Sequence, residues 1–221
     1  MTISNEIINK KWVLKERPEG MAKKSDFDLL EEEISELSEN EIMLKNKYIS
    51  FDPTQRGWLN DAPGYLPPVQ IDEVVRAMGV GEVIESKNDN YQVGDLVIGF
   101  AGWQTYCKTT PDEAGRFRKL DDKFPIPTSL NVLGATGITA YYGMVELGQV
   151  QEGMNVLVSG AAGATGSVAA QIAKINGCHV IGIAGGETKC NWLKNDCGLD
   201  EVIDYKNSNV AEELKLSLIH I

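Results

Sequence analysis

Histidine is scarce in this chain of 221 residues, and the cysteines do not pair in sequence. Only His179 and His220 occur, and none of the four cysteines belongs to a Cys-x-x-Cys motif. The sequence therefore supports neither a zinc lobe nor a redox dithiol. Scattered cysteines favour a reducing, cytoplasmic compartment. No apolar run approaches the roughly 20 residues that span a bilayer, and the N-terminus lacks the apolar core of a secretory signal. We therefore expect no membrane partner.

Positive charge is also in short supply. The chain has 21 Lys and Arg against 32 Asp and Glu, a formal net charge of -11. Because phosphate backbones are bound by clustered Lys and Arg, this balance argues against a nucleic acid as the main partner. Glutamates gather between Glu31 and Glu41, where we expect a solvated face and loop. The hydrophobic fraction of 43% is ordinary for a soluble globular protein.

The first half of the chain has the pattern of a β domain. Between Trp12 and Phe117, short runs rich in Val, Ile and Leu alternate with turn-forming Pro, Gly, Asn and Asp residues. The predicted strands are Ile42–Tyr48, Gly81–Glu85 and Asp95–Phe100. Such regular spacing of turn-forming residues predicts a barrel-like domain.

After Pro127 the pattern changes to alternating helices and strands. A helical stretch at Asn131–Leu147 precedes strand–helix units. The predicted strands are Asn155–Ser159, expected to be buried on both faces, His179–Ala184 and Glu201–Tyr205, and the predicted helices between them are Ser167–Asn176 and Lys189–Asp196. This alternation predicts a parallel sheet with right-handed crossovers. About three strands of the usual six are visible, so the dinucleotide domain is incomplete.

A glycine turn follows the first of these strands. Gly160, Gly163 and Gly166 are spaced G-x-x-G-x-x-G, a variant of the usual G-x-G-x-x-G. Backbone N–H groups and the helix dipole at such a turn bind a phosphate, and glycine lets the backbone approach it. The alternative is a turn tightened only for packing, but the position between a buried strand and a helix favours dinucleotide binding.

Cofactor choice is indicated near the end of the second strand. An NAD site usually has an acidic residue there, whereas this chain has Gly185-Gly186 followed by Glu187, Thr188 and Lys189. The glycine pair leaves room for a 2′-phosphate that Lys189 could bind, which favours NADP(H). Two alternatives stay open: Glu187 could favour NAD, and Lys189 could be an ordinary solvated lysine.

Motifs along most of the chain resemble the zinc-independent branch of the medium-chain dehydrogenase/reductase superfamily, in particular prostaglandin, 2-alkenal and curcumin-type reductases. The matching stretches, in family order, are KWVLKERPEG, YISFDPTQRGWL, YQVGDLVIGFAGWQTY, LGATGITAYYGMVELG, AAGATGSVAAQIAK, GCHVIGIAGGETKC and VIDYK. The resemblance implies an α/β chain with a GroES-like β-barrel domain at residues 1–127 and an incomplete Rossmann doubly wound sheet at residues 128–221. It also implies NADPH-dependent reduction of the C=C bond of α,β-unsaturated aldehydes and ketones.

The resemblance also implies particular cofactor-binding residues. The pyrophosphate turn falls on Gly163, Ala164, Thr165 and Gly166, and the 2′-phosphate lysine falls on Lys189. Tyr205 corresponds to a tyrosine beside the adenosine ribose, and Thr139 to a residue on the nicotinamide side. The catalytic hydrogen-bond donor of the family is expected beyond residue 221.

The zinc ligands of related dehydrogenases do not match here. Those relatives place a Cys just before the segment aligned with Phe51–Asp52 and a Gly-His-Glu at Arg76-Ala77-Met78, and neither is present. We therefore expect no catalytic metal. Many relatives read DPYMR where this chain has Thr54, so a bulky substrate is less strongly implied. Trp58 and Tyr65 either line the substrate pocket or serve as packing residues.

Three functions remain open on the sequence: an NADPH-dependent alkenal or enone reductase, a zinc-free quinone reductase, and a non-catalytic nucleotide-binding protein. The family resemblance implies a homodimer. The final residues Leu216–Ile221 match nothing in the family pattern, and we hypothesise that they are not native.

Overall fold

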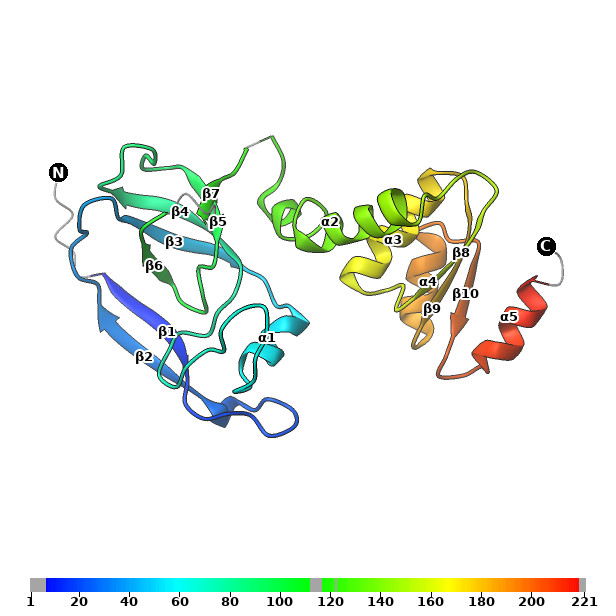
Figure 1. Ribbon diagram of the computed structural model, residues 1–221, viewed down its shortest axis with the longest axis horizontal. Helices are drawn as coiled ribbons and strands as arrows, with labels where there is room; N and C mark the ends of the chain where they lie inside the picture. Colours follow the sequence, from blue (N-terminus) through cyan, green and yellow to red (C-terminus); the bar gives the residue numbers. More distant parts are fainter. Residues whose placement is uncertain (1–6, 112–116, 122, 219–221) are drawn as a thin grey trace. The chain divides into compact units, whose positions relative to one another are not determined.

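The computed structural model describes residues 7–111, 117–121 and 123–218, with side chains as far as residue 215. The chain divides into two compact units, Met1–Leu130 and Asn131–Ile221, here called unit 1 and unit 2 (Figure 1). Each unit has its own hydrophobic core.

Unit 1 is built from antiparallel strands (Figure 1). The strands β1 (Ile8–Leu14) and β2 (Phe27–Glu33) form a two-stranded sheet. A five-stranded sheet has the order β6-β3-β4-β5-β7. Its members are β3 (Ile42–Ile49), β4 (Gly79–Ser86), β5 (Leu96–Gly99), β6 (Tyr106–Thr109) and β7 (Phe117–Lys119). The three strands predicted in this region fall on β3, β4 and β5.

The acidic run is partly a strand. Glu31, Glu32 and Glu33 end β2, and their side chains are exposed, as predicted, but the expected loop is wrong for these three residues. Lys10 and Lys11 of β1 form ion pairs with Glu31 at 2.9 Å and Glu32 at 2.6 Å. Cross-strand charge pairs of this kind stabilise a strand that buries almost no apolar surface.

Short helices fill the remainder of unit 1. The 3-10 helix η1 (Lys24–Asp26) precedes β2, and η2 (Ile126–Leu130) ends the unit. The helix α1 (Pro53–Trp58) starts on a proline, whose fixed φ suits the first helical position. One core cluster lies between the strands of the larger sheet, and a second joins Leu14 of β1 to Leu59 after α1.

Unit 2 is a parallel sheet with helical crossovers (Figure 1). The strand order is β10-β9-β8, with β8 (Asn155–Ser159), β9 (His179–Ala184) and β10 (Glu201–Asp204). The helices are α2 (Ala135–Tyr141), the π-helix η3 (Tyr142–Leu147), α3 (Ala164–Ile175), α4 (Glu187–Asn195) and α5 (Val210–Leu218). The order matches the first half of a doubly wound sheet.

Besides shifts of a few residues at other element ends, two features of unit 2 that bear on the site differ from the prediction. The helix α3 begins at Ala164 rather than Ser167, so Ala164, Thr165 and Gly166 belong to its first turn. The strand β8 is not buried on both faces, since Leu157 is 50% exposed. β8 lies at one edge of the three-stranded sheet in the described part of the chain.

The core of unit 2 lies between α3, α4 and the sheet. Ala170 and Ala173 of α3 pack with Val180 of β9 and Leu193 of α4. Small alanine side chains let α3 approach the sheet closely. No helix among the described residues is long and apolar enough to cross a membrane. Residues 219–221, part of the segment hypothesised to be non-native, lie outside the described residues.

Candidate nucleotide-binding site

Three loops meet at one edge of the sheet in unit 2. The strands β8, β9 and β10 are parallel neighbours, so their carboxyl ends lie side by side. These ends lead into the turn starting at Gly160, the pair Gly185-Gly186, and Tyr205. The carboxyl edge of an open α/β sheet is where such folds bind ligands.

The turn between β8 and α3 requires glycine for steric reasons. Gly160 has a positive φ of 60°, and its carbonyl accepts a hydrogen bond from the N–H of Gly163 at 2.8 Å. A Cβ on Gly166 would lie only 2.3 Å from the Gly160 carbonyl oxygen. The first turn of α3 is therefore held directly against the turn that follows β8.

The amino end of α3 presents free donors. Gly163 caps the helix without a side chain, and the first turn has no acidic residue. The Gly163 carbonyl accepts a hydrogen bond from the Ser167 N–H at 2.9 Å. The N–H groups of residues 164, 165 and 166, in contrast, have no backbone acceptor in the described part of the chain. Such orphan donors, with the positive end of the helix dipole, favour an anion.

The second loop is held by Asp204, a residue that no sequence motif predicted to be part of the site. Asp204, at the end of β10, accepts hydrogen bonds from the N–H of Gly186 at 2.9 Å and from the N–H of Lys206 at 3.0 Å. The Gly186 bond is the main reason why the pKa of Asp204 lies below its usual value. Gly186 has a φ of 97°, which glycine adopts without strain. The signal in sequence was an Asp at the end of the third predicted strand.

Lys189 lies in the first turn of α4, and its side chain is exposed. Its backbone N–H donates to the Gly186 carbonyl at 3.1 Å. No carboxylate among the described residues forms an ion pair with it, so its charge is available to a ligand. Glu187, the competing candidate, is also exposed in the same turn.

Tyr205 lies against the glycine pair. A Cβ on Gly185 would come within 2.6 Å of the Tyr205 ring, so only glycine accommodates the ring in this position. The Tyr205 N–H donates to the Ala184 carbonyl at 3.1 Å, which links the ends of β9 and β10. The ring is 57% exposed and can contact a flat ligand.

Thr139 stands apart from this cluster. It lies on α2, which packs against α3, and its hydroxyl donates to the Ala135 carbonyl at 2.7 Å. Its side chain is exposed. The contact with the nicotinamide side of a cofactor stays a prediction.

In unit 1 the structure brings together the two aromatic residues considered for a substrate pocket. The rings of Trp58 and Tyr65 meet edge to face with centroids 6.4 Å apart, and the Arg76 guanidinium lies over the Trp58 ring at 5.5 Å. Trp58 also packs against the core around Leu59, whereas Tyr65 is largely exposed. No group of three or more His, Cys, Asp or Glu side chains among the described residues could hold a metal ion.

Comparison with known proteins agrees with this architecture. The family model described as "N-terminal domain of oxidoreductase" matches residues 10–116, and the model described as "Zinc-binding dehydrogenase" matches residues 164–217. The chain is 39% identical over 207 residues to an NADPH-dependent curcumin reductase of Escherichia coli (strain K12), covering 93% of this chain and 59% of that protein. It is 35% identical over 209 residues to a 2-alkenal reductase (NADP(+)-dependent) of Nicotiana tabacum, covering 92% of this chain and 60% of that protein.

A solved structure shows the same fold. The structure of CurA from Vibrio vulnificus in complex with NADPH matches with a TM-score of 0.85 and 39% identity, over 93% of this chain and 60% of that one. The strand order, the glycine turn and this match define the class of fold, which is a β domain followed by a doubly wound type of parallel sheet. The chain belongs to the medium-chain dehydrogenase/reductase superfamily, among the curcumin, prostaglandin and 2-alkenal reductase-like proteins.

The predicted fold class, a barrel-like β domain followed by an incomplete Rossmann sheet, is confirmed. The chain spans about 60% of the length of the curated relatives that it matches.

Proposed function

We propose that the protein is an NADP(H)-dependent oxidoreductase that reduces the C=C bond of small α,β-unsaturated aldehydes or ketones. The observation that carries the proposal is the convergence of an unpaired helix N-terminus, a glycine pair and a free lysine at one sheet edge. The names of the curcumin and 2-alkenal reductases among its relatives support the substrate class.

Each part of the edge suits one part of NADP(H). The N–H groups of Ala164, Thr165 and Gly166 would bind the pyrophosphate, and the Lys189 ammonium would pair with the 2′-phosphate. Tyr205, exposed over Gly185, would pack against the adenosine ribose. When bound, the cofactor supplies the hydride.

Several roles follow from the same proposal. Residues 1–127 would form the substrate domain and residues 128–221 the first part of the nucleotide domain, with Thr139 on the nicotinamide side. Reduction would proceed without a metal. We also propose that the protein is cytoplasmic, because its four cysteines are free thiols, as expected in a reducing compartment. We further propose that it is a homodimer, which sedimentation analysis can test.

Lys189→Gln tests the cofactor assignment. Charged hydrogen bonds contribute about 1.5–3 kcal/mol, so the dissociation constant for NADPH should rise about tenfold to a hundredfold. That for NADH should change less than about twofold, since NADH has no 2′-phosphate. Lys194→Gln, on the last turn of the same helix, is the matched control and should bind both cofactors normally. Equal weakening of NADPH and NADH in Lys189→Gln would show that Lys189 does not bind the 2′-phosphate.

The reaction class needs a separate assay. NADPH oxidation is followed with an alkenal, with an enone and with a quinone. Turnover of the first two supports the proposal, whereas turnover of the quinone alone identifies a quinone reductase. NADPH binding without turnover of any acceptor would instead indicate a non-catalytic nucleotide-binding protein.

A further inference from the structure

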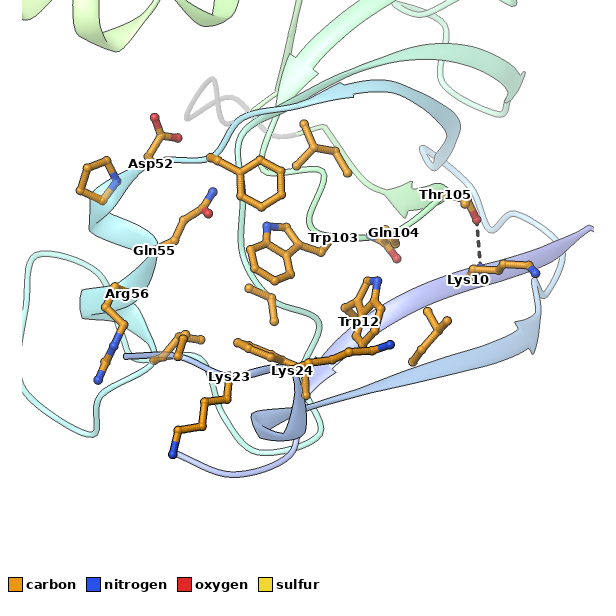
Figure 2. A pocket seen from close by; sticks show the side chains of 18 residues that line it. Lys10, Trp12, Lys23, Lys24, Asp52, Gln55, Arg56, Trp103, Gln104 and Thr105 are labelled. Carbon is orange, nitrogen blue, oxygen red and sulfur yellow. Dashed lines mark hydrogen bonds between the residues drawn. The ribbon is translucent and has the colours of Figure 1, made fainter. Parts of the chain in front are cut away.

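Unit 1 contains a large open pocket that none of the roles above uses (Figure 2). Its volume is about 970 Å³. It lies between the β1–β2 sheet, the segment around η1, the helix α1 and the residues Trp103, Gln104 and Thr105. All its lining residues belong to unit 1.

The interior of the pocket is aromatic. Trp103 stands at its centre in Figure 2, and its ring centroid lies 5.5 Å from that of Phe27 and 5.3 Å from that of Phe51. Trp12 lines the same wall. Phe51 is 79% exposed, so a ligand that covered it would bury apolar area and gain hydrophobic free energy. The Trp103 indole N–H is buried without a hydrogen-bond acceptor in the described part of the chain.

The rim of the pocket is cationic. Lys23, Lys24 and Arg56 line it, and no carboxylate among the described residues forms an ion pair with any of them. Lys24 lies over the Trp12 ring, with its Nζ 5.9 Å from the centroid. Arg56 is bound only by neutral oxygens, including the Gly20 carbonyl at 2.8 Å. Such a cluster in a chain of net charge -11 points to an anionic ligand.

Pro53, Gln55 and Arg56 of α1 line the pocket, whereas Thr54 of the same helix is exposed and does not line it. Asp52 is the one acidic lining residue, and its carboxylate accepts from the Ser50 hydroxyl at 2.7 Å.

We propose that this pocket binds a free anionic amphiphile, a molecule with one carboxylate and an apolar chain or ring system. The apolar part lies on Trp12, Phe51 and Trp103, and the carboxylate lies at Lys23 and Lys24. The site is independent of the nucleotide-binding edge, and its test needs no cofactor.

Dodecanoate below its micelle concentration is the probe. Binding is followed by tryptophan fluorescence, because two of the four tryptophans line the pocket, and by calorimetry. We expect saturable binding of one dodecanoate per chain, at least about tenfold tighter than that of dodecanol. The double variant Lys23→Gln/Lys24→Gln should lose about five- to tenfold in dodecanoate affinity and keep its affinity for dodecanol.

Lys45→Gln is the matched control, because Lys45 is an exposed lysine of unit 1 that does not line this pocket. It removes one positive charge and should leave dodecanoate binding unchanged. Phe51→Ala should weaken the binding of both dodecanoate and dodecanol. Thermal unfolding checks that every variant is folded.

Three results would overturn the proposal. The first is equal affinity for dodecanoate and dodecanol. The second is an equal loss of dodecanoate affinity in Lys45→Gln and in the double variant. The third is binding to vesicles of anionic phospholipid, or formation of a dimer that excludes dodecanoate, without binding of the free amphiphile.

Discussion

Replacing Gly166 by alanine tests the steric basis of the nucleotide site. The added Cβ would lie 2.3 Å from the Gly160 carbonyl oxygen and 3.0 Å from the Ala161 Cα. Ordinary contact begins at 3.4 Å, so the first turn of α3 must move by about 1 Å. Both obstructing atoms belong to the backbone, which cannot swing aside as a side chain can.

The expected change in the free energy of unfolding follows from two opposing effects. Overpacking costs about 1–3 kcal/mol, while the better helix propensity of alanine returns up to about 1 kcal/mol. We therefore expect a net loss of about 1–2 kcal/mol in the free energy of unfolding of unit 2. For a unit of this size, each kcal/mol lowers Tm by about 4–8 °C. Displacing even one N–H group from the pyrophosphate should weaken NADPH binding about tenfold or more.

Circular dichroism melting and a titration with NADPH measure both effects. Gly143→Ala is the matched control, because Gly143 lies on the helical segment η3 of the same unit and its Cβ would meet nothing within 4 Å. That variant should be as stable as the unaltered chain or gain roughly 0.5–1 kcal/mol. If Gly166→Ala melts and binds NADPH like Gly143→Ala, the close approach at Gly160 does not constrain the site.

Two further predictions concern titration and thiol reactivity. Partial burial raises the pKa of Asp200, but hydrogen bonds from Lys174 and the Val180 N–H outweigh this effect and hold the pKa below its usual value. The stability that this carboxylate contributes is therefore present above about pH 4 and is lost as the pH falls further. Lys174→Met should therefore cost about 0.5–1 kcal/mol at pH 7 and nothing near pH 2 in denaturant titrations, and an equal cost at both pH values would contradict this account. Burial raises the pKa of the Cys107 thiol to about 12, so alkylation at pH 8 should reach the half-buried Cys190 first, as mass spectrometry of peptides can show. Labelling of Cys107 at the same rate in the folded chain would refute the prediction.

The sequence predicted unit 2 better than unit 1. The bounds of β8 and β9 were correct because short runs of Val, Ile and Leu stand between turn residues. The start of α3 was placed three residues late, because the whole stretch from Gly160 to Gly166 was assigned to the turn, whereas Gly166 belongs to the first turn of the helix. In unit 1, β1 and β2 were missed because charged residues such as Lys10 and Glu31 occupy facing positions of the two strands, so the sequence shows no apolar periodicity there.

The candidate site was predictable only where chemistry follows the chain order. The glycine turn and Lys189 come directly after predicted strands, so strand–turn–helix spacing located them. Asp204 was missed because its role, holding the Gly186 N–H, depends on two parallel strands being neighbours. The aromatic pocket of unit 1 joins residues from β1 to Thr105, a span that no local motif covers.

The outer edge of β8 can accept a further strand, which links the stability of unit 2 to whatever binds there. No strand pairs with its second edge in the described part of the chain, and Leu157 lies half exposed there. Any segment able to add a strand at that edge binds the folded form and not the unfolded one, and thereby shifts the folding equilibrium by mass action. If that segment belongs to a second copy of this chain, the melting temperature of unit 2 should rise with protein concentration, and a melting temperature that stays constant would exclude such pairing.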